Sequence, residues 1–329
     1  MERADLDVDV RTITSGKFRR YAHLSVWGYL RHPSIMARNF VDLFRVAIGY
    51  MQSLAIIIKF QPDAVFAKGG FVCLPLGLAA ATLRIPLVIH DSDIRPGLTN
   101  RILARYAQSI ATGFPLENYH YPMQRSYYTG VPIDDTYKPV TLSEQAAYKA
   151  QFGFTADQPL VLAFGGGLGS VTINDAAADL AKTLDDLQVY NGTGKAHIER
   201  AARRGEGLKN YRPESFVPGL HDIMAAADIV VTRASATALQ ELAGMAKTVI
   251  AVPARQLSDQ QQNAKLYKSA GAVEVLTDDE LTEKLSPLMK ELIADDIRRA
   301  TLSKKLHTFA KPEAARQIAQ IVQKAATNK

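Results

Sequence analysis

The stretch Leu160-Val-Leu-Ala-Phe-Gly-Gly-Gly-Leu-Gly-Ser170 decides the fold of this chain. An apolar run typical of a buried strand leads into four glycines within five positions: Gly165, Gly166, Gly167 and Gly169. A helical pattern begins directly after them, at Ile173-Asn174. Backbone N–H groups and the positive end of a helix dipole then converge on the loop, which favours a bound phosphate or pyrophosphate. Tight packing of the strand against the helix would explain the same glycines, and both interpretations stay open on this stretch alone.

Apolar runs alternate with helical patterns along most of the chain. The expected strands are 64–67, 87–90, 109–112, 127–130, 160–164, 228–231 and 248–252, and the expected helices include 74–83, 97–107 and 143–152. Such β–α–β alternation predicts parallel sheets covered on both faces by helices. We therefore expect an α/β protein of two doubly wound, Rossmann-like domains, with the carboxyl ends of the strands facing an interdomain cleft.

The linker between the two domains is expected at Pro132–Pro139, which contains Asp134 and Asp135. The predicted domains are 1–133 and 134–310, and 311–329 is a C-terminal helix expected to pack back toward the first domain. The first domain looks incomplete, because no apolar strand with its own glycine cluster precedes Lys68-Gly69-Gly70.

Composition narrows the class of protein. The 329 residues are 47% apolar and 22% charged, as in globular proteins. One cysteine, Cys73, excludes an intrachain disulfide framework and zinc clusters and fits a reducing cytoplasm. No signal peptide is visible at the N-terminus. No stretch approaches the length of a membrane span, since the apolar run Leu54–Ile58 is bounded by Gln52 and Lys59.

A net charge of +6 points to an anionic partner. The segment Lys17–Arg45 is basic and aromatic, and it contains Arg19, Arg20, Trp27, Arg31, Arg38, Phe40 and Phe44. Docking on an anionic membrane surface would use such a segment, whereas a solvated basic face is the plainer alternative. No nucleic-acid partner is expected, because no zinc finger, helix-turn-helix or RNA-binding aromatic motif accompanies the charge.

Three more segments place polar groups at the ends of expected strands. Thr232–Ala243 opens a helix with small residues and carries Glu241, whose carboxylate could accept two ribose hydroxyls or lie on an ordinary helix surface. Ser258–Asn263 offers amides to a sugar or simply an N-cap to its helix. His90, Asp91 and Asp93, followed by Asn100, are placed for proton transfer or hydroxyl recognition, although a lone buried histidine is usually structural.

Together these motifs resemble the bacterial N-acetylglucosaminyltransferase family that converts undecaprenyl-pyrophosphoryl-muramyl-pentapeptide into the disaccharide lipid precursor of peptidoglycan. The matching stretches, in the family's order, are 66–75, 88–93, 96–101, the glycine loop with 173–174, 232–243 and 260–264. The resemblance implies the two-domain GT-B fold, with an acceptor- and membrane-facing first domain and a UDP-sugar donor domain. It also implies peptidoglycan synthesis, and with it a part in cell shape and division.

The resemblance assigns site residues by position. The glycine loop resembles the pyrophosphate cradle, Glu241 the ribose contact, and Val217 the backbone that reads uracil. The remaining expected donor contacts are Asp93, Arg233, Ala236, Thr237, Ala238, Leu239, Gln240, Gln260 and Asn263. On the acceptor side the expected residues are Gly69, Gly70, Phe71, His90, Asp91 and Asn100, with His90 and Asp91 as candidate catalytic groups.

The expected reaction is an inverting transfer of N-acetylglucosamine from UDP-N-acetylglucosamine to the lipid-linked acceptor, on the inner face of the cell membrane, with no metal and no cofactor. Three departures from the family pattern support alternatives. The opening Gly-Gly-Thr-Gly-Gly-His loop has no counterpart, Gly167 replaces a serine, and Asp134 replaces an arginine. A catalytically impaired or partner-dependent homologue, or a soluble UDP-N-acetylglucosamine epimerase, therefore stays open.

Overall fold

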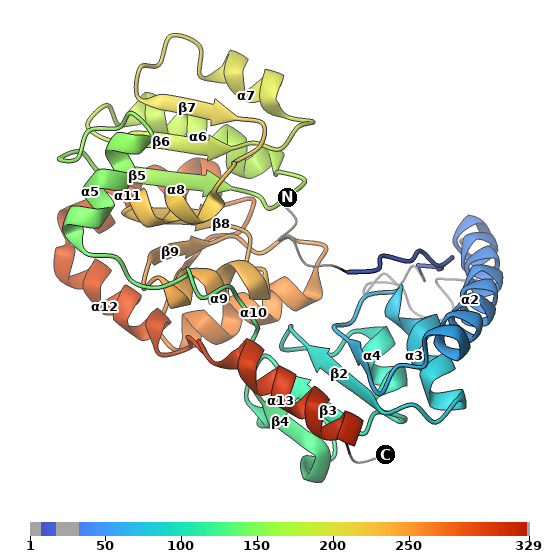
Figure 1. Cartoon of the computed structure of the whole chain (residues 1–329). Helices are drawn as coiled ribbons and strands as arrows, with labels where there is room; N and C mark the ends of the chain where they lie inside the picture. The colour runs from blue at the N-terminus through green and yellow to red at the C-terminus, as the bar shows by residue number, and fades with distance from the viewer. Residues whose placement is uncertain (1–7, 18–32, 328–329) are drawn as a thin grey trace. The chain divides into compact units, whose positions relative to one another are not determined.

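The computed structural model of the chain describes residues 8–17 and 33–327 (Figure 1). Contacts divide the chain into two compact units, the first holding the residues up to Asp91, Pro96–Tyr128 and the segment from Arg316 onward. The second unit holds Ser92–Arg95 and Thr129–Ala315. The main division thus falls at Thr129, slightly before the expected boundary at residue 134, and the short segment Ser92–Arg95 groups with the second unit.

The first unit contains a four-stranded parallel sheet. Its strands follow one another in chain order: β1 (Val65–Ala67), β2 (Leu87–Asp91), β3 (Ser109–Thr112) and β4 (Ser126–Tyr128). The expected strands are therefore present, with ends shifted by no more than two residues. The helices of this unit are α2 (Pro33–Phe60), α3 (Cys73–Thr82), α4 (Leu98–Leu103) and most of α13 (Ala314–Thr327), with short 3-10 turns η1 (Leu116–Asn118) and η2 (Met123–Arg125).

The long helix α2 corrects a prediction from the sequence. Residues Met36–Phe60 form a helix that is long and apolar enough, by length and composition, to cross a membrane. The sequence prediction failed because it considered only the run Leu54–Ile58, whereas few charges interrupt the helix as a whole. One stripe of α2, which includes Val46 and Ile57, is buried in the hydrophobic core shared with α3. Most of the remaining surface of α2 is exposed.

The second unit contains a six-stranded parallel sheet in the order β10-β9-β8-β5-β6-β7. Its strands are β5 (Leu160–Phe164), β6 (Gln188–Gly192), β7 (Tyr211–Glu214), β8 (Ile229–Thr232), β9 (Thr248–Ala251) and β10 (Glu274–Val275). Its helices are α5 (Leu142–Gln151), α6 (Val171–Thr183), α7 (Ile198–Arg204), α8 (Leu220–Ala226), α9 (Ala236–Gly244), α10 (Ser258–Ser269), α11 (Leu281–Ala294) and α12 (Asp296–His307).

This strand order reverses between β5 and β8. From β5 the chain proceeds outward to β6 and β7, and from β8 it proceeds the other way to β9 and β10. Loops that leave the carboxyl ends of two strands at such a switch point diverge and leave room for a ligand. The glycine loop follows β5 and the Arg233–Ser235 turn follows β8, so these two loops lie where the sheet leaves room for a ligand.

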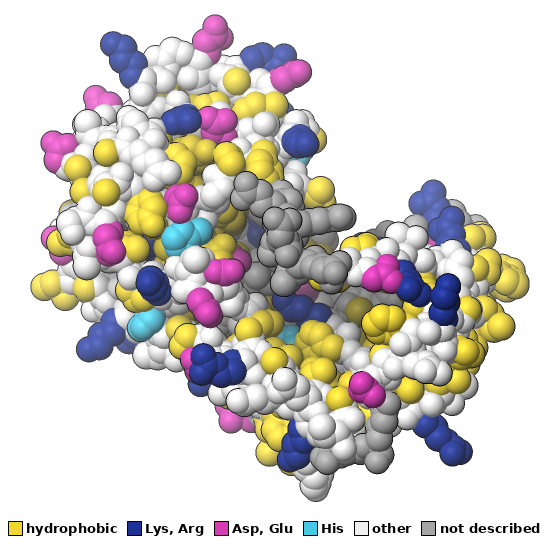
Figure 2. Space-filling view, in the orientation of Figure 1, with side chains coloured by type: hydrophobic (Ala, Val, Ile, Leu, Met, Phe, Trp, Pro, Cys, Tyr) yellow, Lys and Arg dark blue, Asp and Glu magenta, His cyan; other side chains and the backbone are white. Residues whose placement is uncertain are grey.

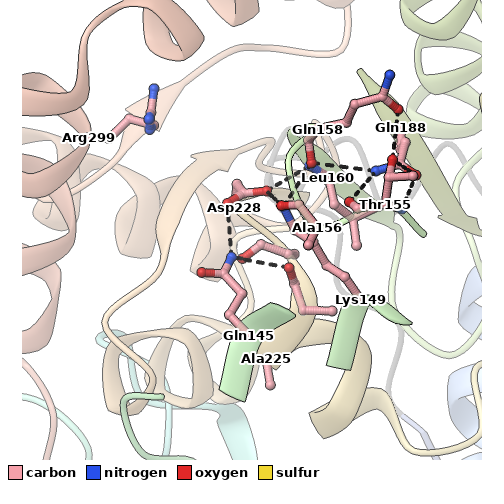
Figure 3. Close-up of polar contacts among 12 residues, drawn as sticks. Gln145, Lys149, Thr155, Ala156, Gln158, Leu160, Gln188, Ala225, Asp228 and Arg299 are labelled. Carbon is pink, nitrogen blue, oxygen red and sulfur yellow. Dashed lines mark hydrogen bonds and ion pairs between the residues drawn. The ribbon is translucent and has the colours of Figure 1, made fainter. Parts of the chain in front are cut away.

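The opposite, amino ends of β5 and β8 are fixed by a polar cluster around Asp228 (Figure 3). Asp228 accepts hydrogen bonds from the Leu160 backbone nitrogen at 2.7 Å and from Gln145 Nε2 at 2.9 Å. Lys149 lies 2.8 Å from the same carboxylate and donates to the carbonyl of Gln158. These contacts tie α5 to the starts of both strands, at the end of the sheet opposite the two switch-point loops.

Candidate functional site

The glycine loop joins the buried strand β5 to helix α6 through a tight turn. The Gly169 backbone nitrogen donates to the Gly166 carbonyl at 3.0 Å. Ser170 caps α6, its hydroxyl accepting from the Ile173 nitrogen at 3.4 Å. Gly166, Gly167 and the first two residues of α6, Val171 and Thr172, are exposed, so an anion can reach the start of this helix.

The four glycines are not equivalent. A Cβ at Gly165 would lie 2.4 Å from the Ser170 nitrogen, and one at Gly169 would lie 1.9 Å from the Thr193 carbonyl oxygen. Gly166 has φ +82°, a left-handed conformation that favours glycine. At Gly167 a Cβ would meet nothing within 4 Å, so geometry does not require glycine there. Packing therefore requires glycine at positions 165 and 169, and Gly167 is the position at which a hydroxyl would fit.

Arg233, in the turn after β8, reaches the glycine loop. Its guanidinium donates to Ser170 Oγ at 2.6 Å and forms an ion pair with Asp278 at 2.8 Å. Thr172, in the first turn of α6, donates to the same Asp278 carboxylate at 2.5 Å. The two switch-point loops are therefore linked by a charged contact that sequence reasoning missed. The negative charge of Asp278 neutralises part of the positive charge that Arg233 would otherwise present to a phosphate.

Glu241 lies half-buried on α9 and already has a partner. The Tyr137 hydroxyl is hydrogen-bonded to the Glu241 side chain, and burial together with the charges of Glu241 and Asp134 raises the pKa of Tyr137 to about 12. Asp134 itself accepts from the Thr136 nitrogen at 3.0 Å and from its hydroxyl at 2.8 Å, which holds the pKa of Asp134 below its usual range. The carboxylate of Glu241 is thus oriented by a tyrosine of the linker, and Asp134 stays charged at neutral pH.

Helix α10 contributes one amide that is buried and one that is half-buried. Asn263 is fully buried, donating to the Ala234 carbonyl at 3.1 Å and to Asp93 at 3.2 Å. Gln260 accepts from the Ala254 nitrogen at 3.0 Å. Asn263 therefore holds the turn after β8 and the Asp93 segment together, which brings several predicted donor residues into one place.

The remaining predicted donor residues differ in their access. Leu239 and Gln240 are buried, and Gln240 donates to the Phe309 carbonyl at 2.8 Å, so these side chains stabilise the packing of α9. Ala236 and Ala238 are buried near the start of α9, where Ser235 caps the helix, and Thr237 is exposed. Val217, between β7 and α8, is half-buried.

In the first unit, the predicted acceptor residues gather at the carboxyl ends of β1 and β2. Gly69 and Gly70 form the turn after β1 with φ +87° and +85°, and Phe71 beside them is exposed. A Cβ on Gly69 would lie 3.2 Å from Asn100 Nδ2, so the glycine lets the turn lie against the start of α4. Parallel pairing of β1 with β2 brings this turn to the edge where β2 ends.

Asp91, the last residue of β2, is the centre of a buried hydrogen-bond network. Asn100 Nδ2 donates to Asp91 Oδ1 at 2.8 Å and to the His90 carbonyl at 2.9 Å. The Tyr121 hydroxyl donates to Asp91 Oδ2. Burial raises the pKa of Asp91 above its usual range, although these hydrogen bonds and the Gly97 backbone oppose the shift. His90 is also fully buried.

The expected basic segment is only partly described. Arg19, Arg20, Trp27 and Arg31 lie outside the described residues, whereas Arg38 and Arg45 lie on α2 and are exposed. Within residues 8–17 and 33–327 there is no group of three or more His, Cys, Asp or Glu side chains placed to hold a metal ion.

Comparison with known proteins decides the family. The glycosyltransferase family 28 N-terminal domain matches residues 8–112, and its C-terminal domain matches residues 160–318. A protein of Lachnospira eligens, named UDP-N-acetylglucosamine–N-acetylmuramyl-(pentapeptide) pyrophosphoryl-undecaprenol N-acetylglucosamine transferase, is 34% identical over 88% of this chain and 78% of its own length. The chain belongs to glycosyltransferase family 28. It is thus a glycosyltransferase with the two-domain GT-B type of fold.

Solved structures agree on the fold. MurG of Acinetobacter baumannii aligns with a TM-score of 0.68 at 22% identity, covering 86% of this chain and 79% of that one. UDP-GlcNAc 2-epimerase of Neisseria meningitidis, bound to UDP-GlcNAc, aligns with a TM-score of 0.65 at 14% identity, covering 85% and 81%. MurG and an epimerase give similar scores, so the likeness to these solved structures shows the fold alone. The relatives found by sequence are named as transferases.

Proposed function

We propose that this family 28 glycosyltransferase moves N-acetylglucosamine from UDP-N-acetylglucosamine to a lipid-linked muramyl-pentapeptide. The observation that carries the proposal is the pair of loops at the β5–β8 switch point, combined with the reaction named for the relatives. The loop amides and the first turn of α6 present N–H groups to a diphosphate. Glu241, oriented by Tyr137, accepts the ribose hydroxyls, and Val217 and Gln260 contact the base and the donor sugar.

In the proposed mechanism, Asp91 is the group that accepts a proton from the acceptor hydroxyl. Its raised pKa suits a general base, because a carboxyl whose pKa lies nearer to neutral binds the proton more readily. The hydroxyl oxygen then attacks the anomeric carbon from the side opposite UDP, and the configuration inverts. The charge that develops on the departing diphosphate is stabilised by the N-terminus of α6 and by Arg233. The scheme calls on no metal.

The experiment that tests this proposal measures UDP released from UDP-N-acetylglucosamine with and without a lipid-linked muramyl-pentapeptide. We expect release that depends on the acceptor. UDP-N-acetylmannosamine formed without any acceptor would favour the epimerase instead. If UDP binds and neither reaction occurs, the catalytically impaired homologue is favoured. The negative charge of Asp134, which replaces an arginine of the family pattern, supports that alternative.

We further propose that the enzyme works on the inner face of the cell membrane and docks there through α2. The outward face of α2 carries large exposed apolar side chains: Met36, Phe40, Val41, Leu43, Phe44, Ile48, Met51, Ile58 and Phe60. Yellow side chains accordingly gather in Figure 2 over the region where Figure 1 draws α2. Arg38, Arg45 and Lys59 on the same helix supply positive charge for anionic headgroups.

Vesicle binding tests the docking proposal. The rings of Phe40 and Phe44 lie 5.0 Å apart and are 62% and 56% exposed, so both are available to the lipid. Replacing both with serine removes about 2 kcal/mol of apolar transfer and should weaken binding to anionic vesicles about 30-fold. Ile297→Ser is the matched control, since Ile297 is 82% exposed on α12 of the other unit. Equal loss in both variants would count against α2 as the docking face.

A further inference from the structure

The loop between β3 and β4 carries a tyrosine pair that the proposed mechanism does not yet use. The rings of Tyr119 and Tyr121 are stacked, with centroids 5.7 Å apart and planes 10° from parallel. Tyr119 is buried, and the ring of Tyr121 packs against the hydrophobic core of the first unit. The start of this loop is joined to β2, because the Gly113 nitrogen donates to the Asp91 carbonyl at 2.7 Å. The position of the Tyr121 ring is therefore fixed by packing.

The Tyr121 hydroxyl is directed at one oxygen of Asp91, while Asn100 holds the other. The amide of Asn100 binds Oδ1 from α4, and the phenol of Tyr121 binds Oδ2 from the β3–β4 loop. Two donors on opposite oxygens fix the rotation of the carboxyl plane, since neither oxygen can turn without breaking a bond. A carboxylate with a hydrogen-bonding donor is also stabilised in its charged form.

We propose that Tyr121 is a positioning residue for Asp91, holding its carboxylate in one orientation and in the ionised form that accepts the proton from the acceptor hydroxyl. The inference rests on the proposed role of Asp91 as the base. It adds a residue that the family resemblance did not indicate, contributed by a loop rather than by a strand end.

The groups around the carboxylate agree with this role. Burial raises the pKa of Asp91, and the Tyr121 hydroxyl is the first of the contacts that lower it, followed by Asn100 and the Gly97 backbone. Burial and the Asp91 charge raise the pKa of Tyr121 far above its usual range, so the phenol keeps its proton and remains a donor. The neighbouring Tyr119 raises the pKa of Tyr121 further, whereas Arg101 lowers it. Removing the phenol hydroxyl therefore shifts Asp91 toward its protonated form.

The test is the pH profile of kcat/KM for Tyr121→Phe, which keeps the stacked ring and removes only the hydroxyl. We expect the acidic limb to move up by about one pH unit, a tenfold loss of rate on that limb. The rate at high pH and the KM for UDP-N-acetylglucosamine should stay within threefold of wild type. A purely structural role would lower the rate at every pH. Tyr106→Phe is the control, because Tyr106 is 53% exposed in the same unit.

Two further measurements separate this inference from the proposed base. Asp91→Asn should abolish transfer, and full activity in that variant would remove Asp91 as the base whatever Tyr121 does. An inactive Asp91→Asn with an unmoved limb in Tyr121→Phe would overturn the positioning role alone. A carbon-13 NMR titration of the Asp91 carboxyl compares Tyr121→Phe with wild type without any need for turnover.

The same titration can be made with 3,5-difluorotyrosine at position 121. Because its phenol is a stronger hydrogen-bond donor, the Asp91 titration should move to lower pH. An upward shift or no shift in that protein would contradict the inference.

Discussion

The contact between Tyr137 and Glu241 gives a prediction of defined size for Glu241→Gln. If the Glu241 carboxylate accepts two ribose hydroxyls, each of these charge-assisted hydrogen bonds contributes about 2 kcal/mol, and a neutral amide contributes about 1 kcal/mol in its place. The loss over two bonds is about 2 kcal/mol, so the Kd for UDP should rise about 30-fold. Isothermal titration calorimetry with UDP measures the change directly.

Tyr137 supplies both a graded comparison and a second measurement for this prediction. Tyr137→Phe keeps the Glu241 charge and removes only the hydroxyl that orients it, so the Kd for UDP should rise about fivefold, less than in Glu241→Gln. Because the Glu241 charge helps to raise the pKa of Tyr137 to about 12, Glu241→Gln should lower that pKa, as followed by phenolate absorbance. The pKa of Tyr137 in that variant should still stay above 10, because burial contributes more than the Glu241 charge to raising it. A folded Glu241→Gln protein whose Kd changes by less than threefold would refute the ribose role.

Other predictions concern the loop, a buried lysine and metal. Gly167→Ser has open space for its side chain and adds a donor at the α6 N-terminus, so it should tighten UDP binding about tenfold, whereas Gly169→Ser should abolish binding by collision with Thr193. Lys247 is buried, which lowers its pKa to about 8, so the unfolded chain binds more protons than the folded one between about pH 8 and the ordinary lysine pKa of 10.5. The free energy of unfolding of the wild-type protein, measured by chemical denaturation, should therefore rise across that pH range by about 3 kcal/mol relative to that of Lys247→Met. Parallel curves of unfolding free energy against pH for the two proteins would refute the lowered pKa of Lys247. Transfer should be unchanged by EDTA, and loss of activity restored by Mg²⁺ would show that a metal is needed.

Local patterns predicted much of the fold. The apolar run before Gly165 became β5 without a shift in either end, and the glycines after it became the turn at the switch point. The weaker strands β6 and β7 were not predicted, since Gln188, Asn191 and Arg212 interrupt their apolar pattern. Helix α2 was missed for a different reason. Its exposed face carries large apolar residues such as Phe40, Phe44 and Ile48, so apolar and polar residues do not separate cleanly onto a buried and an exposed face.

The residues that complete the candidate site were not predictable from spacing. Tyr121 meets Asp91 across 30 positions and Arg233 meets Ser170 across 63, and neither pair has a local signature. Only the sheet order brings these loops together. A usable signal did exist for Tyr121, because Tyr119-His-Tyr121 is an aromatic cluster in the loop that follows β3, and the loops after parallel strands are where such sheets place their sites.

The central claim is that this chain transfers a sugar to a lipid-linked acceptor, and mass spectrometry of that acceptor tests it most directly. Incubation of the protein with UDP-N-acetylglucosamine and the undecaprenyl-pyrophosphoryl-muramyl-pentapeptide should convert the acceptor into a species heavier by one N-acetylhexosamine. The same incubation with Asp91→Asn should leave it unchanged. An acceptor that keeps its mass with the wild-type protein, while UDP still binds, would contradict the account.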